Sequence, residues 1–359
     1  MPSDRDPSAG PRVHPRVDRL AAYGWRLLVI AAAAVGLLWL ARQLAPVLIP
    51  ATVALFLTRL LTPISDRLRA RLRPGLAAAA AMVVLLAAIV GLSWLVVPPI
   101  ADEAAALPQT ISQAIDDIER WLVEDSPFEI SREAVDRFRT RTADRLRDLL
   151  PSSGGRVVDG ATLAAEIVAG LFLSLLFTFF MLRDGARFSR WLRSRLRPGQ
   201  RDRAERAARR GWSTLGGYLR GAAMLGIVES IAIGLALVVA GGTLVVPVMV
   251  LTFVAAFVPI LGAVVAGVTA TLVALVTGGV VSAAIVAVVA LAVQQLDNDV
   301  LAPWVYGRSL ALHPVVILVS VVGGGALFGI AGTLLAVPVV AVAVSVGKEL
   351  STASPEAPA

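Results

Sequence analysis

The side chains best suited to binding chemistry lie in one short segment, which consists of Gln294, Gln295, Leu296, Asp297, Asn298 and Asp299. No Asp, Glu, Lys or Arg occurs in residues 230–296. The carboxylate and amide oxygens of the segment could bind a hydroxylated solute, a cation or a proton. An ionisable group at membrane depth costs about 2.5–3.5 kcal/mol on insertion scales, so its presence in an apolar stretch indicates a functional site.

The two carboxylates of this segment, Asp297 and Asp299, stand two residues apart. On a regular helix they point in different directions, so both can face one cavity only if the helix is broken there. Pro303 follows closely enough to break it. The alternative interpretation is a solvated cytoplasmic loop between two membrane spans, and the residues alone leave both open.

Glu229 is the only acid in the apolar stretch 222–240. A buried carboxylate without a partner is costly in its charged form, so Glu229 could take up and release a proton. The alternative is a structural carboxylate that reaches the membrane surface or pairs with an arginine.

Two segments predict breaks in apolar helices. Pro259 and Gly262 form the first break. Non-helical backbone at membrane depth is tolerated only where it is buried in protein or lines a cavity. For this reason, a broken helix in a secondary transporter indicates the substrate path. The second is the run Gly323, Gly324 and Gly325, followed by Gly329 and Gly332, which predicts a hinge or break and also permits close helix packing.

The composition is that of a membrane protein, with 57% hydrophobic and 16% charged residues. There is no Cys, and His14 and His313 are the only histidines. The sequence contains no P-loop, HExxH, Gly-x-Ser-x-Gly or dinucleotide-binding motif. We therefore predict that the protein is not an enzyme and has no catalytic residues, metal site or cofactor.

The apolar stretches predict an all-α, polytopic membrane protein with about eight transmembrane segments, because a spanning helix needs about 20 apolar residues. Some segments are expected to be broken or re-entrant, since Leu244–Val276 is too long for one ordinary helix and predicts either two passes or a re-entrant hairpin. The clearest spans are Leu27–Leu44, Val47–Leu61 after a turn between Pro46 and Pro50, Gly75–Val97 closed by Pro98-Pro99, Ala161–Leu182 and Ala222–Ala240.

The distribution of arginine predicts the orientation. Residues 1–26, 59–73 and 183–220 carry five, five and twelve Arg against three, one and three acids, whereas residues 98–160 carry thirteen acids against eight Arg. The positive-inside rule places the three basic segments and the N-terminus in the cytoplasm and the acidic segment outside. Positive charge between apolar spans also argues against nucleic acid as a partner.

These boundaries predict seven regions. They are a disordered cytoplasmic tail (1–25), N-terminal transmembrane segments (26–97), an extracytoplasmic helical insert (98–160), a transmembrane segment (161–182), cytoplasmic Arg-rich interfacial helices (183–220), a C-terminal transmembrane bundle with the transport path (221–347) and a cytoplasmic tail (348–359). The amphipathic period in residues 100–150 predicts a helical hairpin that docks on the spans or a neighbouring subunit, or has no ligand of its own. Phe188 and Trp191, opposed by arginines, predict a helix lying against anionic lipid.

Several of these motifs resemble those of a known family. Phe257-Val258-Pro259-Ile260-Leu261-Gly262 is similar to its Pro-x-x-Gly element, and its C-terminal signature is matched by Gln294-Gln295, Pro303, Gly307-Arg308-Ser309, His313-Pro314, Gly324, Gly329 and Pro338. Pro98-Pro99 and Arg183-Asp184-Gly185 also fit. Over residues 25–347 the chain resembles the autoinducer-2 exporter family, or PerM-type permeases.

The resemblance implies a multi-spanning protein of the bacterial inner membrane, with the N-terminus in the cytoplasm, that exports a small polar solute such as autoinducer-2, with protons as the possible driving ion. A sodium–proton antiporter is the alternative within transport, and a membrane scaffold that recruits partners through the 100–150 hairpin is the alternative outside it. The expected path uses Glu229, Pro259, Gly262, the 294–299 segment and Arg308. The expected partners are the lipid bilayer, a small polar solute or ion, and further copies of the chain in a homo-oligomer.

Overall fold

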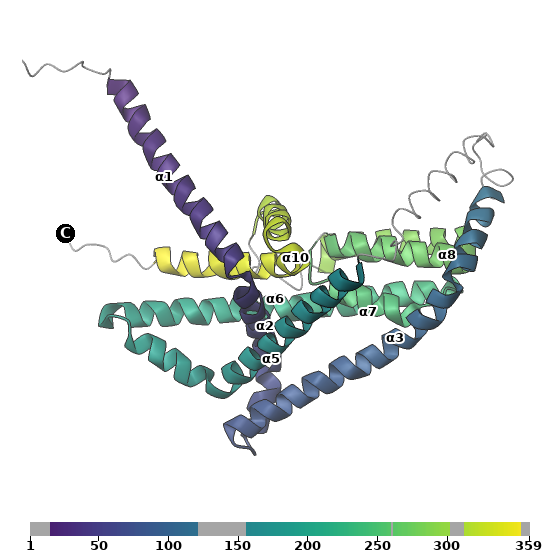
Figure 1. Ribbon diagram of the computed structural model, residues 1–359, viewed down its shortest axis with the longest axis horizontal. Helices are drawn as coiled ribbons and strands as arrows, with labels where there is room; N and C mark the ends of the chain where they lie inside the picture. The colour runs from purple at the N-terminus through teal and green to yellow at the C-terminus, as the bar shows by residue number, and fades with distance from the viewer. Residues whose placement is uncertain (1–14, 121–155, 260, 302–311, 353–359) are drawn as a thin grey trace, which may run out of the picture. The chain divides into compact units, whose positions relative to one another are not determined.

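The described part of the chain consists of helices joined by short turns. The computed structural model describes residues 15–120, 156–259, 261–301 and 312–352. Within these ranges, seven helical regions are long and apolar enough to cross a membrane, and α7 is a shorter apolar helix. The predicted all-α, polytopic fold is therefore confirmed. The elements, labelled as in Figure 1, are α1 (Pro15–Gln43), α2 (Ala45–Arg69), α3 (Pro74–Arg120), α5 (Arg156–Ser194), α6 (Pro198–Val239), α7 (Val245–Ala255), α8 (Leu261–Leu296), the π-helix η2 (Asp297–Leu301) and α10 (Pro314–Thr352).

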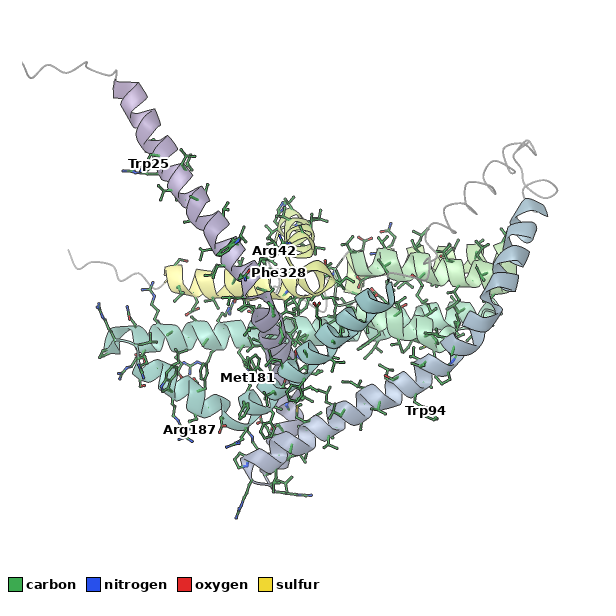
Figure 2. The ribbon with its side chains drawn as sticks, in the orientation of Figure 1. Trp25, Arg42, Trp94, Met181, Arg187 and Phe328 are labelled. Carbon is green, nitrogen blue, oxygen red and sulfur yellow. The ribbon has the colours of Figure 1, made fainter. Side chains whose placement is uncertain are left out.

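The chain divides into two units, Met1–Leu48 and Ile49–Ala359. The first contains α1 and the first residues of α2, and the second contains the rest of the chain. In both units large apolar side chains lie on the surface. Figure 2 shows Trp94 pointing away from α3, and its side chain is 81% exposed. Such an apolar surface is expected of helices that face lipid.

Helix α6 is the central element of the second unit and contacts α5, α7, α8 and α10. Its buried face contributes to two apolar clusters. One joins Leu215, Tyr218, Leu219 and Ala222 of α6 to α10, and the other joins Ile233, Ala236 and Leu237 of α6 to α7 and α8. A third cluster joins α2, α3 and α5 around Leu61, Ala78, Ala81 and Leu182.

Helix α7 and the first half of α8 form a re-entrant hairpin. α7 has 11 residues, which span about 16 Å at 1.5 Å per residue, too short for a hydrocarbon core of about 30 Å. The two ends of the hairpin meet, because the Thr243 backbone N–H donates to Thr277 Oγ1 (3.3 Å) and Ser282 Oγ donates to Ala240 O (2.7 Å). The chain thus turns near Pro259 and runs back to the level of Thr243, and the short length of α7 favours the re-entrant hairpin over two full passes for Leu244–Val276.

Helix α8 then folds back on itself at Gly279. This residue has φ 79° and ψ −172°, a conformation that side chains disfavour and glycine accepts. The two halves pack together, since a Cβ built on Gly267 would lie 3.5 Å from the Cβ of Ala290. Two packed helical stretches, one on each side of Gly279, therefore replace one straight helix of 36 residues.

The break in α10 lies at Gly329, within the glycine-rich segment expected to break but not at its three adjacent glycines, Gly323, Gly324 and Gly325. Gly329 has φ 62° and ψ −147°, and Figure 1 shows the two parts of α10 running in different directions. The three adjacent glycines stay helical because they serve close packing. A Cβ on Gly324 would lie 2.6 Å from Gly332 O, and one on Gly325 would lie 2.7 Å from Thr333 Oγ1.

Several helix boundaries also differ from the expected ones. α3 continues through Pro98 and Pro99 to Arg120, so these prolines do not end it. Helices in membranes tolerate proline where neighbouring groups satisfy the freed backbone atoms. α2 includes Pro50, so the turn before it is confined to Leu44. The arginine-rich segment 183–220 forms the ends of α5 and α6 and contains no separate interfacial helix. Most of the 100–150 hairpin lies outside the described residues.

Candidate functional site

Close packing of α7 on α6 buries the centre of α6. Glycines make this approach possible, because a Cβ on Gly226 would lie 2.9 Å from Phe253 O and one on Gly234 would lie 2.5 Å from the Met249 side chain. Both glycines flank Glu229 on α6. They bring the polar side chain of Glu229 against the re-entrant hairpin rather than toward lipid.

Glu229 borders a small cavity inside this packing. The residue is 6% exposed, and the cavity has a volume of about 20 Å³. A void that size holds about one water molecule. Helices α6, α7 and both halves of α8 supply the walls, which consist of Glu229, Ile233, Thr252, Ala263, Ala266, Gly267, Ala290, Val293 and Gln294.

Three polar side chains converge on this cavity from three helices. Thr252 Oγ1 donates to Val248 O (2.8 Å), so its remaining capacity toward the cavity is as an acceptor. Gln294 brings an amide from the second half of α8. Among the described residues, Glu229 has no hydrogen bond or ion pair, so its carboxyl group is available to a proton, a water molecule or a solute.

Asp297 lies in the π-helix η2, where α8 changes its winding. Its Oδ1 atom is buried and has no hydrogen-bond partner, and the residue lies close enough to Glu229 for the two carboxylates to repel each other. Asp299 is exposed. The two aspartates therefore do not face one cavity, since residues two apart stay on opposite sides of a π-helix as they do on an α-helix. π-helical turns inside long helices occur frequently at functional sites.

The tip of the re-entrant hairpin lies beside the same cavity. Gly262 permits the turn, since a Cβ there would collide with the backbone of Ala255. Tyr218 Oη of α6 donates to Phe257 O (2.6 Å) and so fixes the turn before Pro259. The predicted break and the predicted proton carrier, Glu229, are thereby brought together by contacts that no sequence pattern displays.

The remaining predicted residues do not join this group. Gln295 is exposed, the side chain of Asn298 is not among those described, and Arg308 lies outside the described residues. No group of three or more His, Cys, Asp or Glu side chains that could hold a metal ion occurs in the described ranges.

The sequence interpretation missed Thr252, Tyr218 and Arg59. Arg59 had been counted with a basic loop, but it lies well inside α2 and borders a second cavity. The sequence does mark Arg59 as unusual, because it is the first charged residue after a run of sixteen uncharged residues that begins at Gln43. Tyr218 and Thr252 gave no comparable signal, since isolated hydroxyl groups are common in apolar helices.

Comparison with known proteins identifies the family of this chain. A family described as "AI-2E family transporter" matches residues 27–351. The chain belongs to the AI-2E transporter family. The resemblance found in the sequence motifs is thereby confirmed.

Two similar proteins carry names that agree with a transport family. The chain is 34% identical over 332 residues to MT0215 of Mycobacterium tuberculosis (strain CDC 1551 / Oshkosh), covering 92% of this chain and 90% of that protein, which is provisionally named a transport protein. It is 33% identical over 129 residues, or 36% of each chain, to YrrI of Bacillus subtilis (strain 168), which carries the same provisional name. These names specify transport and no substrate.

Proposed function

We propose that this AI-2E family member is a secondary transporter that exports a small polar solute and couples export to proton movement through Glu229. We place it in the bacterial inner membrane with its N-terminus in the cytoplasm, because the arginine-rich segments fall on one side of the first spans. Autoinducer-2 is the first solute to test, because the family resemblance suggests it.

The observation that carries this proposal is the buried, unpartnered carboxyl group of Glu229 at the tip of a re-entrant hairpin. An acid at this depth must be neutral or must pair with something that enters the cavity, since an isolated charge there is costly. Gln294 and Thr252 supply the groups that would orient a hydroxylated solute or a water molecule. A cavity for one water molecule is too small for such a solute, so transport requires the hairpin or η2 to move.

The decisive experiment compares Glu229→Gln with wild type in proteoliposomes loaded with labelled autoinducer-2 under an imposed pH gradient. Gln keeps the size and polarity of Glu but cannot exchange a proton. We expect gradient-driven efflux to fall to background and to lose its dependence on pH. Glu166→Gln is the matched control, because Glu166 is an exposed acid on α5. Normal gradient-driven efflux in the Glu229 variant would refute the coupling role.

Cation–proton antiport is the second candidate, favoured by the proximity of Glu229 and Asp297. Two neighbouring carboxylates suit a cation that exchanges with a proton. In vesicles containing a pH-sensitive dye, added sodium should then produce proton flux in wild type and none in Glu229→Gln. Absence of any response to sodium, potassium and lithium would reject this candidate and leave solute export.

A further inference from the structure

The C-terminal half of helix α2 carries a polar stripe that follows an apolar first half. The side chains recur at steps of three and four residues, so they share one face of the helix. All of them border the same cavity, and they are Thr58, Arg59, Thr62, Ser65, Asp66 and Arg69. A membrane helix that has such a face must direct it toward protein or a polar ligand, because lipid would leave these groups unsatisfied.

The cavity beside this stripe has the size of a small-molecule site. Its volume is about 760 Å³, within the range of about 300–1,000 Å³ typical of ligand pockets. Its other walls come from α5 and α6, and it shares no residue with the Glu229 cavity. Leu55, Phe188 and Leu192 are exposed apolar side chains on its border, where hydrocarbon could lie.

Most of the arginines around this cavity already have acceptors. Arg69 donates to the backbone oxygen of Leu182, and Arg193 and Arg209 both bind the Glu205 carboxylate. The lining side chains comprise four arginines against Asp66 and Glu205, which leaves an excess of two positive charges.

Arg59 differs from these arginines. Its Nε atom is buried with no hydrogen-bond acceptor, and the described residues offer the guanidinium no carboxylate. The group lies over the Trp212 ring, 5.4 Å from the ring centroid, in space that exists because residue 216 is glycine. Arg220 adds a second positive charge nearby. Thr58 Oγ1 and Ser65 Oγ, on the same stripe, are also buried without partners.

We propose that this cavity binds a phosphate group, carried either by an anionic phospholipid or by a soluble molecule, with Arg59 as its principal ligand. Guanidinium groups match the geometry of phosphate oxygens and form strong charge-assisted hydrogen bonds with them. A bound phosphate would compensate the excess positive charge and supply the acceptor that Arg59 lacks. This inference does not depend on the proposed transport path.

The test measures binding to the full-length protein, purified in detergent and depleted of lipid. The probes are dioleoylphosphatidylglycerol, dioleoylglycerol as the uncharged lipid without a phosphate group, and inorganic phosphate. We expect Arg59→Gln to bind the anionic probe at least about tenfold more weakly, as for loss of a hydrogen bond to a charged group. Arg67→Gln, an exposed arginine on the same helix, is the matched control and should change affinity by less than about twofold.

Binding of phosphatidylglycerol but not inorganic phosphate would support the lipid source, and binding of inorganic phosphate would support the soluble one. The proposal is overturned if wild type binds neither phosphate-containing probe, if it binds dioleoylglycerol as tightly as phosphatidylglycerol, or if Arg59→Gln binds as wild type does. If Arg59→Gln does not fold, Gly216→Ala provides the second variant, because the new Cβ would displace the guanidinium. Gly170→Ala is its control, since a Cβ there meets nothing within 4 Å.

Discussion

The two cavities of this protein carry charge of opposite sign in spaces of very different size. The Glu229 cavity is acidic and holds about 20 Å³ between α6, α7 and α8. The Arg59 cavity is basic and holds about 760 Å³ between α2, α5 and α6. Small side chains such as Ala266 and Gly267 close the first, whereas long arginines and apolar side chains line the second.

The difference indicates what each cavity can do. A carboxyl group in a tight space can become neutral by taking one proton, so it needs no large ligand and is suited to coupling. A guanidinium keeps its charge in proteins, so a wide space beside it calls for an anion. Transport chemistry is therefore expected at Glu229 and ligand binding at Arg59.

The largest effect is expected from Gly262→Ala, which would destroy the acidic cavity by pushing the hairpin tip away from α6. The new Cβ would collide with the Ala255 backbone, which cannot rotate away as a side chain can. We expect destabilisation of about 3 kcal/mol, at the upper end for overpacking, and loss of efflux. Thermal unfolding measures the destabilisation, and a proteoliposome assay measures the efflux. Wild-type values for both would contradict the assigned role of the tip.

Adding the same side-chain volume to each cavity compares the two cavities directly. Ala266→Val adds two methyl groups at the small cavity, where the space for about one water molecule would be filled, so efflux should fall by about tenfold or more. Ala208→Val adds the same volume at the large cavity, where it should be tolerated. Efflux measured side by side distinguishes them. Equal effects of the two variants would mean that the small cavity has no special part in transport.

The two aspartates of η2 should differ in a smaller way. Asp297→Asn removes the carboxylate that acts on Glu229, and we expect efflux to change by about tenfold, the size of a single charge interaction of about 1.4 kcal/mol. Asp299→Asn changes an exposed residue and should alter efflux by less than about twofold. Measuring the efflux rate of each variant across a range of pH gives the size of both effects. A larger effect at Asp299 would restore the interpretation that both aspartates line the path.

The smallest effects are expected when the variant of one cavity is measured in the assay for the function of the other cavity. Arg59→Gln should leave efflux within about twofold of wild type, and Glu229→Gln should leave anion binding within about twofold, because sites without shared partners act independently. Efflux and binding assays on the same preparations provide the comparison. Strong coupling in either direction would show that the two cavities act as one.

Much of the fold followed from the sequence, because the cost of exposing polar groups to hydrocarbon forces long apolar stretches into helices. The break near Pro259 and the re-entrant arrangement of Leu244–Val276 were both among the expected possibilities. The break in α10 was expected in the glycine-rich segment 323–332, but its hinge was assigned to Gly323, Gly324 and Gly325 rather than to Gly329. Composition does not reveal whether a glycine supplies a positive φ, as Gly329 does, or a surface for close packing, as Gly324 does.

The sequence by itself determined that the protein is a membrane transporter of the AI-2E family and that Glu229 is an unusual acid, because periodicity, charge distribution and motifs are local properties of the chain. Only the tertiary structure decided the partners of each polar residue. It placed Glu229 beside Gln294 and the hairpin tip, separated Asp297 from Asp299, and left the buried Nε atom of Arg59 without an acceptor among the described residues that border a wide cavity. The physical reason is that these contacts join residues far apart in the chain and depend on how closely glycine lets the helices approach.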